Sequence, residues 1–576
     1  MLENIRRLLP DNSRQYREET SQRISWGHWF ALFNIVVALL ISSRYAFNAD
    51  WPNTLFGKLY FFISLFGHFS FVVFALYLLI LFPLSFIIKN HRAFRGISVI
   101  IATFGMTVLL VDTEVFKRFY LHLSPLVWDL LVNPDEGELA RQWQLLFVPM
   151  PIILLVEMLY SRWCWNKLRS FNRQKWSKYV ALFFLICFTA THLLYAWADM
   201  SLYRPITAQR ANYPLAYPMT ARTFLEKHGL VDRSVLEQQI EESGRLDTFY
   251  LNYPKKPLQY TAAPNKVNLL FINISGLTND VITPDKMPNL TQIGLNSRRF
   301  IHHYSGGNSA AAGIVSLFYG LSGRYVDAIL NEKEPSVLIS TLQHFDYQFG
   351  LYSHNGFNEP IYYRALFAGF KLPKAKNNLE AIEQWKTWLN SRTEQPLFSY
   401  LDLALPSTDH DQLAQLDLQL ADIWLQLEQQ GLTKSTLIIL TADIADKHIE
   451  TANGFTPQRI EVPLLMYWQG DKGSYNRLSS HLDMVPTLLN QFFGVSSPIS
   501  DYAQGIDLTK ANERKWLLAS DYKWNVAVTA DNEQFHIDRK GDFEYYDAQG
   551  EQQRNNRPPL ALFLQLIQQS NQFIEK

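Results

Sequence analysis

Four polar residues stand at the carboxyl ends of apolar runs in the second half of the chain: Ser275, His354, Asp402 and Asp443. In open α/β sheets, ligand sites form at this edge of the strands. Hard divalent ions require several oxygen or imidazole ligands, and a bound metal activates a nearby hydroxyl. The set could therefore hold a metal or act on a polar substrate, provided that the strands bring its members together.

The elements that must position these residues begin at about Lys266, where short apolar runs alternate with helical stretches such as Gln412–Gln430. This alternation predicts an α/β domain with a mostly parallel sheet covered by helices on both faces. The predicted buried strands are Val267–Ile274, Tyr347–Ser353, Leu397–Leu403, Thr436–Asp443 and Val462–Trp468.

The first 200 residues are far more apolar than the mean hydropathy of −0.09 indicates. About 20 apolar residues in a helix cross the hydrocarbon of a membrane. Soluble core helices are the alternative, but five such segments in series with basic connectors are rare in soluble folds. We therefore predict a five-helix transmembrane domain over residues 26–197. The five stretches lie near Trp26–Ser43, Tyr60–Ile88, Ile97–Phe116, Leu145–Tyr160 and Tyr179–Trp197.

The connectors predict an orientation. The N-terminal segment 1–25 is rich in arginine, and the connectors Lys89–Arg95 and Arg162–Lys178 carry basic residues and no acidic ones. Basic connectors stay in the cytoplasm, so the N-terminus is expected inside and everything after Trp197 outside. The two cysteines, Cys164 and Cys187, precede this exported part, which must fold without disulfides. Lys+Arg and Asp+Glu both number 53, so no nucleic-acid partner is expected.

The order of motifs from 265 to 510 resembles the sulfatase branch of the alkaline phosphatase superfamily, near lipoteichoic acid synthases and phosphoethanolamine transferases. The resemblance implies a sulfatase-like domain over 263–576, periplasmic on the orientation above. The segments that carry it are INISGL, HHYSGGNSAAAGIVSLFYGLSGRY, LYSHNG, LTKSTLIILTADIAD, RIEVPLLMYW, HLDMVPTLLNQFFGV and GIDL.

Active members of this superfamily hold divalent metals with a carboxylate at the first strand, a hydroxyl or modified cysteine nucleophile, and an Asp-His pair. In this chain Ser275 stands where the first carboxylate is expected, and Ile444 follows Asp443 in place of histidine. The nucleophile position falls at Ser309. Ser309, Asp443 and His354 are therefore vestigial candidates, and we expect neither catalysis nor a resident metal cofactor.

Each candidate also has a structural interpretation. Ser309 could cap a helix, Asp443 could accept from a backbone amide, and His354 and His481 could be structural histidines. The rival hypothesis is a metal-dependent phosphatase, or a phosphoethanolamine or phosphoglycerol transferase, with Ser309 as nucleophile and residual divalent metal near Asp443.

The segment 198–262 is predicted as an interfacial linker. It mixes aromatic and apolar residues with basic ones, notably Arg204, Arg210, Arg222 and Lys227. Aromatic side chains can lie at the acyl boundary while guanidinium groups meet headgroup phosphates. A plain linker is the alternative, but such a linker is more often rich in glycine and serine.

The five spans and the segment YPLAYPMTARTFLEKHGL together resemble a family of inner-membrane proteins of Gram-negative bacteria. The resemblance implies that this segment binds lipid A, the membrane part of lipopolysaccharide, in the periplasmic leaflet. The family has two consecutive basic residues here, whereas Arg222 is followed by Thr223, which removes one predicted phosphate contact. The implied lipid A-binding residues are Tyr217, Pro218, Met219, Thr220, Ala221, Arg222 and Thr223.

The same resemblance implies a lipopolysaccharide sensor. Its cytoplasmic-side partner is the adaptor LapB, which works with the protease FtsH to control degradation of LpxC, the committing enzyme of lipid A synthesis. An anionic phospholipid such as cardiolipin is a further expected ligand, and a cardiolipin carrier is a third hypothesis. Within the spans, His68 and His192 are candidates for contacts between helices.

Overall fold

The computed structural model describes residues 11–49, 51–132, 145–221, 226–228, 233–261, 267–446, 453–511, 514–553 and 558–575. The chain forms two compact units, Met1–Arg233 and Ser234–Glu575. The segment predicted as a linker, 198–262, is therefore shared between the two units.

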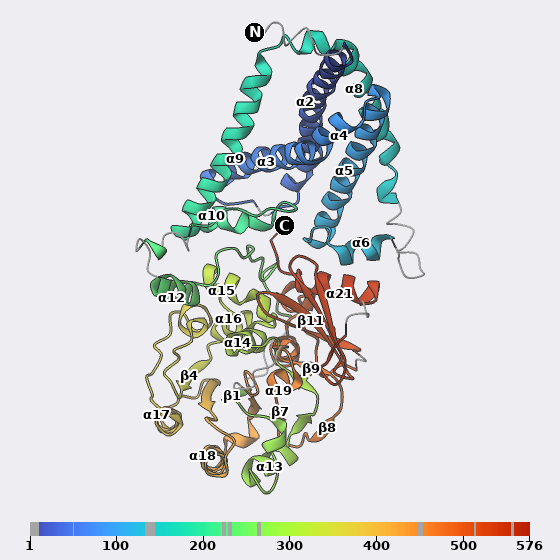
Figure 1. The fold of residues 1–576 in the computed structure, drawn as a ribbon. Coiled ribbons are helices and arrows are strands. Elements are labelled where there is room, and N and C mark those ends of the chain that lie inside the picture. The colour runs from blue at the N-terminus through green and yellow to red at the C-terminus, as the bar shows by residue number, and fades with distance from the viewer. Residues whose placement is uncertain are drawn as a thin grey trace. The chain divides into compact units, whose positions relative to one another are not determined.

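The first unit contains five helices that are long and apolar enough to cross a membrane, as the sequence predicts (Figure 1). The second crossing is made of three consecutive pieces, because a π-helical turn, η1, precedes Pro83. The elements are α2 (Asp11–Ala46), α3 (Leu55–Leu76), η1 (Tyr77–Leu81), α4 (Phe82–Ile87), α5 (His91–Phe119), α6 (Pro125–Val132), η2 (Leu145–Phe147), α8 (Met150–Phe171) and α9 (Trp176–Met200).

The fourth of these crossings extends beyond its predicted end, because α8 continues to Phe171 instead of ending near residue 160. Basic residues of 162–169 thus form its last turns, where arginine and lysine are good helix formers and complement the helix dipole. Pro149 caps the helix and Pro151 lies in its first turn, where a missing N–H is tolerated.

The second unit is built on a seven-stranded sheet with the order β4-β5-β1-β6-β7-β2-β8. β1 pairs in parallel with both β5 and β6, and β7 runs antiparallel to its neighbours. The mostly parallel sheet and the five predicted strands are confirmed. The strands are β1 (Asn268–Ser275), β2 (Arg298–Phe300), β4 (Gln348–Ser353), β5 (Leu397–Ala404), β6 (Thr436–Thr441), β7 (Leu464–Tyr467) and β8 (Gly473–Tyr475).

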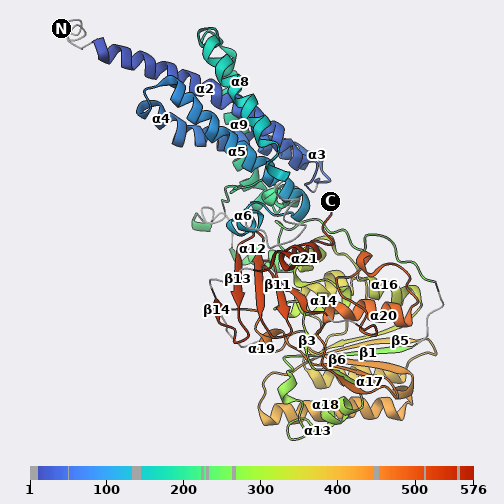
Figure 2. The ribbon, with the colours of Figure 1, turned by 90° about the vertical axis from the view of Figure 1, so that its right-hand side faces the viewer.

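Helices cover both faces of this sheet (Figure 2). Along β1, Leu269 and Phe271 pack into one core while Leu270 and Ile272 pack into another, as the two-residue period of a strand requires. The first core contains α14 (Ala310–Tyr319), α15 (Val326–Glu332), α16 (Val337–His344) and α20 (Met484–Phe492). The second contains α13 (Pro288–Leu295), α17 (Asn378–Asn390) and α18 (His410–Gln429).

A second, antiparallel sheet of five consecutive strands follows residue 515 and was not predicted (Figure 2). Its first strand lies against the loop that precedes α15, and α21 (Leu560–Ser570) packs on its first two strands. The strands are β10 (Trp516–Ser520), β11 (Trp524–Thr529), β12 (Gln534–Asp538), β13 (Phe543–Tyr546) and β14 (Gln552–Gln553). A separate short pair joins β3 (His303–Tyr304) to β9 (Ser479–Ser480).

Candidate functional site

The carboxyl edge of the main sheet brings together two of the predicted polar residues, His354 and Asp402 of β5, with two residues that were not predicted, Asn273 and Ser353. Asn273 Nδ2 donates to Asp402 Oδ1 at 2.9 Å, and Ser353 Oγ donates to Oδ2 at 2.8 Å. His354 Nδ1 lies 3.6 Å from the same Oδ2, and its backbone N–H donates to the Asp402 carbonyl at 2.8 Å. Asp402 is only 4% exposed. Its carboxylate is thus engaged by neutral donors, and His354 is held at the edge of the strand.

Ser309 is exposed and caps α14. Its backbone is extended, at φ −138° and ψ 159°, and its Oγ accepts from the Ala312 N–H at 3.3 Å. The residue therefore stands at a helix N-terminus, where the superfamily places its nucleophile. The same contact is the ordinary cap that serine favours.

Asp443 follows β6 and lies directly against α14. Its carbonyl oxygen would lie 1.9 Å from a Cβ built on Gly313, so only glycine permits this approach. Ser305 Oγ donates to that carbonyl at 2.9 Å, while the Asp443 carboxylate accepts from the Ile444 N–H at 2.8 Å. Asp443 as a whole is 4% exposed, and its carboxylate already accepts a hydrogen bond from the backbone of its own turn.

The donor set does not fit the divalent metal of this superfamily. Ser275 ends β1 with a buried hydroxyl that has no hydrogen-bond partner among the residues the structure describes, where a carboxylate ligand is expected. The residue after Asp443 is Ile444, which supplies no donor atom from its side chain. Among the described residues no group of three His, Cys, Asp or Glu side chains is placed to hold a metal. One carboxylate and one hydroxyl give too few ligands for a hard cation.

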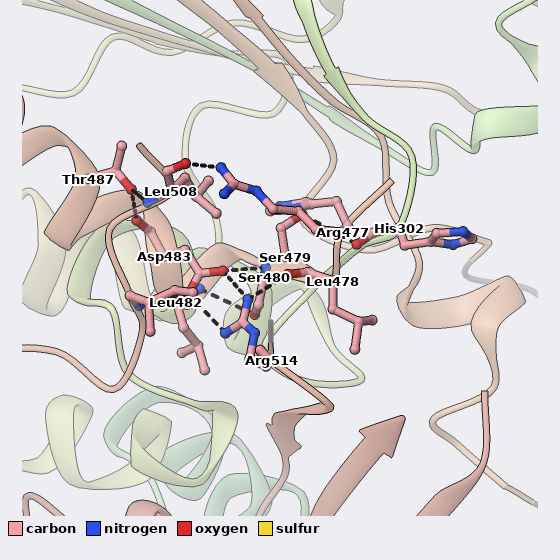
Figure 3. A network of polar contacts seen from close by, with 12 residues as sticks. His302, Arg477, Leu478, Ser479, Ser480, Leu482, Asp483, Thr487, Leu508 and Arg514 are labelled. Atoms are coloured by element: carbon pink, nitrogen blue, oxygen red, sulfur yellow. Dashed lines mark hydrogen bonds and ion pairs between the residues drawn. The ribbon is translucent and has the colours of Figure 1, made fainter. Parts of the chain in front are cut away.

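His481 and the Asp-x-x-Pro-Thr motif that follows it are built into the core of the second unit. The His481 imidazole is fully buried with Nε2 3.0 Å from Thr441 Oγ1, and burial lowers its pKa to about 3. The carboxylate of Asp483 accepts two bonds from Arg514, Nη2 to Oδ2 at 2.5 Å and Nη1 to Oδ1 at 3.1 Å (Figure 3).

The rest of this network ties α20 to the chain around residue 507. Asp483 Oδ2 accepts from the Ser480 N–H at 2.7 Å, and Oδ1 accepts from the Ile506 N–H at 2.9 Å. Thr487 Oγ1 donates to the Asp483 carbonyl and accepts from the Leu508 N–H at 2.9 Å (Figure 3). The motif thus has a structural role in this chain.

A second candidate site lies within the first unit, as a groove of about 340 Å³ between α3, α9 and the segment 209–218. The helices supply an apolar floor that includes Phe71, Val72 and Phe188, and the segment supplies Arg210, Tyr217 and Pro218. The Arg210 guanidinium lies 6.0 Å from the centre of the Tyr217 ring. Tyr217 is 81% exposed, which is unusual for a large aromatic side chain.

Several hydrogen bonds fix the segment as the wall of this groove. After α10 (Arg204–Thr207) and the 3₁₀ turn η3 (Ala208–Ala211), Tyr213 OH donates to the Phe61 carbonyl at 3.0 Å. His68 Nε2 lies 2.8 Å from the Pro214 carbonyl, and the Met219 N–H donates to His192 Nδ1 at 3.2 Å. The two histidines predicted as helix contacts thus hold the segment.

The groove also depends on a close approach of α3 and α9. A Cβ on Gly67 would lie 2.7 Å from the Cys187 carbonyl oxygen, so glycine allows the two helices to touch at backbone distance. His68 follows directly in α3 and so faces the segment from a fixed position.

The predicted lipid A-binding residues are only partly described. Tyr217 and Pro218 line the groove, and Met219 is tethered by its backbone. Thr220 and Ala221 follow without lining it. Arg222 and Thr223 lie outside the described residues.

A polar cluster inside the first unit was not predicted from the sequence. Asp112 of α5 is 3% exposed; its carboxylate accepts from Tyr45 OH and from the Leu123 N–H, and lies 2.7 Å from His122 Nδ1. His122 Nε2 lies 3.0 Å from the Ala211 carbonyl. The cluster joins α2 and α5 to η3, next to the groove wall. An acidic residue within a predicted span was the signal available in the sequence.

Comparison with known proteins supports both units. A family model described as a domain of unknown function (DUF3413) matches residues 13–260, and the sulfatase model matches residues 347–495. An uncharacterized protein of Haemophilus influenzae is 49% identical over 98% of both chains. The inner membrane protein YejM of Salmonella typhi is 40% identical over 97% of this chain and 99% of that protein.

Two solved structures resemble the second unit. A protein of the alkaline phosphatase superfamily from Vibrio parahaemolyticus has a TM-score of 0.45 and 16% identity, covering 60% of this chain and 98% of its own. The lipoteichoic acid synthase LtaP from Listeria monocytogenes has a TM-score of 0.42 and 11% identity, covering 55% and 94%. The sequence identity to YejM extends over nearly the whole of both chains, so the protein belongs to the YejM family of inner membrane proteins, with a sulfatase-like second unit.

Proposed function

We propose that this protein is a membrane-anchored sensor of lipopolysaccharide that recognises lipid A at the groove of the first unit. The observation that carries the proposal is the composition of the groove, with an apolar floor from two membrane-spanning helices and a wall that presents Arg210 and Tyr217. Acyl chains fit the floor, and a guanidinium binds a phosphate through charge-assisted hydrogen bonds.

Regulation requires two states of the helices with different affinity for the lipid. The contact from His122 to the Ala211 carbonyl and the bonds of Asp112 link the groove wall to α2 and α5. Lipid that displaces the wall would alter these contacts. With the N-terminus in the cytoplasm and the second unit in the periplasm, the helices would thereby bind LapB more or less tightly. LapB works with the protease FtsH, so the rate at which LpxC is degraded would change.

The test measures binding of lipopolysaccharide by the full-length protein in nanodiscs of phosphatidylethanolamine. Arg210→Gln is expected to weaken binding about tenfold, because it removes one charge-assisted contact. The matched control is Arg92→Gln, an exposed arginine at the start of α5. Unchanged binding in Arg210→Gln and in Tyr217→Ala would contradict the proposal.

Complementation of a deletion strain separates the rival functions. A sensor predicts that Ser309→Ala complements, while Arg210→Gln alters LpxC levels. A metal-dependent phosphatase or transferase predicts failure of Ser309→Ala. A cardiolipin carrier predicts changed cardiolipin movement with unchanged LpxC. The side chains around Ser275 and Ile444 do not fit a divalent metal among the described residues, which supports the sensor over the enzyme.

A further inference from the structure

Arg324 of the second unit is a buried cation with no ion-pair partner among the described residues. The residue lies in the 3₁₀ turn η5 (Gly323–Tyr325) and is 7% exposed. Its Nε and Nη1 atoms are buried and have no hydrogen-bond partner in the part of the chain that the structure describes. Its guanidinium lies 5.4 Å from the centre of the Phe249 ring. Burial of an unpaired cation is costly, so such groups normally have partners.

Among the described residues, Arg23 is the other arginine that is equally buried, and it follows that rule. Arg23 of α2 donates to the carbonyls of Ser85 and Lys89 and to the Thr20 hydroxyl. The half-buried Arg514 is paired with the carboxylate of Asp483. Arg324 therefore differs from Arg23 and Arg514, whose contacts are structural, and its lack of a partner among the described residues needs an explanation.

Two more arginines lie near Arg324, both stacked on Tyr522. The guanidinium of Arg245 lies 4.1 Å from the centre of the Tyr522 ring, and that of Arg539 lies 4.3 Å from it. Tyr522 lies in the turn between β10 and β11, and Arg539 in the turn between β12 and β13. The first and third turns of an antiparallel meander lie at the same end of the sheet, about 10 Å apart at two strand spacings. We call Arg245, Arg324, Arg539 and Tyr522 the arginine cluster.

The backbone of the arginine cluster is firmly held. The Arg324 N–H donates to Ser520 Oγ at 2.8 Å, and the Arg245 N–H donates to Asp327 Oδ1 at 3.0 Å. A Cβ on Gly323 would lie 2.2 Å from the Ser520 carbonyl oxygen, so η5 packs directly on the end of β10. Preorganised donors of this kind lose little entropy when they bind a ligand.

The charges in the cluster do not cancel. Two carboxylates lie among the three guanidiniums: Asp247, which accepts from Tyr522 OH at 2.5 Å, and Asp327, which holds the Arg245 backbone. One positive charge remains uncompensated. Burial, and then the like charge of Arg539, lower the pKa of Arg324 to about 10, so the guanidinium stays protonated at neutral pH.

We propose that the arginine cluster binds a phosphate group, with Arg324 as its central donor. A guanidinium presents several N–H donors in a planar fork that matches phosphate oxygens, and phosphate supplies the negative charge that the cluster lacks. Two sources share this chemistry, a phospholipid headgroup and a soluble phosphate ester. The site lies wholly within the second unit and does not depend on the lipid A groove.

The test uses the purified full-length protein in detergent micelles at constant ionic strength. Calorimetric titration with glycerol phosphate is one arm, and titration with micelles that contain phosphatidic acid, against phosphatidylcholine, is the other. We expect saturable binding in at least one arm. Arg324→Met should weaken it by about tenfold or more, and Arg392→Met, after α17, serves as the control. Binding in the first arm identifies a soluble ester, and binding confined to the second identifies a lipid.

The melting temperature without phosphate separates the proposal from a structural role for Arg324. On the proposal, replacement of an unpaired buried cation by an apolar side chain leaves this temperature unchanged or raises it, whereas a structural role predicts that it falls. Arg539→Gln provides a second variant at a turn, should Arg324→Met fail to fold, and is also expected to weaken binding. Arg210→Gln in the first unit should leave the effect of Arg324→Met intact, which separates this site from the lipid A groove. Absence of saturable binding in both arms, or equal binding by the wild type and both cluster variants, would overturn the proposal.

Discussion

The Nε2 atom of His68 lies 2.8 Å from the carbonyl oxygen of Pro214, so a side chain within α3 holds a backbone group 146 residues further along the chain. A carbonyl only accepts, so His68 carries its proton on Nε2 and donates. His192 does the reverse, because its Nδ1 accepts from the Met219 N–H. Two imidazoles thus hold both ends of the short stretch that bears Tyr217.

Replacement of His68 should loosen this stretch. His68→Phe keeps an aromatic ring but removes the donor, and loss of one hydrogen bond costs about 1 kcal/mol. We expect amide hydrogen exchange of residues 213–219 to accelerate about fivefold in the full-length protein in nanodiscs. His28→Phe, a histidine on a different face of the helix bundle, is the control. Equal exchange rates in His68→Phe and the wild type would show that the bond does not hold the segment.

Ser309 offers a test that separates capping from catalysis. Ser309→Ala removes the acceptor for the Ala312 N–H and should destabilise the second unit by about 1 kcal/mol in thermal unfolding. Ser309→Asp keeps a side-chain acceptor at the cap and should retain stability, although it lacks the hydroxyl nucleophile. We expect both variants to complement a deletion strain. Loss of complementation by both would instead indicate that the hydroxyl acts chemically.

The sequence predicted the main sheet well because its strands are buried on both faces. Such strands read as continuous apolar runs, of which VNLLFINI in β1 is an example. The strand ends then follow from parallel pairing, which is why Asp402 and His354 meet as expected. The absence of a carboxylate at position 275 could also be predicted, because the identity of Ser275 is read directly from the sequence.

The second sheet and the arginine cluster were not predicted, for two different reasons. The strand β12 (QFHID) alternates polar and apolar residues between the turns DNEQ and RKGD, a hairpin pattern that the sequence does contain. The proximity of Arg539 to Arg324 depends instead on packing between elements some 200 residues apart. Local patterns carry no information on such contacts, nor on the pairing of His68 with Pro214.

The ion pair of Asp483 and Arg514 should be costly to break but less costly to replace. Arg514→Met leaves a fully buried carboxylate with backbone donors only, and loss of one partner in such a pair typically costs about 3–5 kcal/mol. Asp483→Asn with Arg514→Met should be less destabilised than the sum of the two single variants. Thermal unfolding of the wild type, the two single variants and the double variant measures the coupling energy between Asp483 and Arg514. Simple additivity would show that the two side chains act independently.

The second unit should lose stability as pH falls below about 6.5, because three of its histidines, His303, His481 and His536, are buried in the neutral form. Burial holds the pKa of His303 well below its ordinary value. Burial lowers the pKa of both His481 and His536 to about 3. In the unfolded chain each imidazole has a pKa near 6.5, so between these values the unfolded state binds more protons than the folded state. Stability therefore rises with pH across this window, and a fall from pH 7 to 5 should remove about 2 kcal/mol per histidine.

Thermal unfolding of the full-length protein across this pH range measures the slope. His481→Gln should flatten it by about a third of the histidine contribution, since the amide takes up no proton and can still bond to Thr441. His410→Gln, at an exposed position at the start of α18, is the matched control. An unchanged slope in His481→Gln would mean that this imidazole titrates in the folded protein, which its complete burial between Thr441 and His303 opposes.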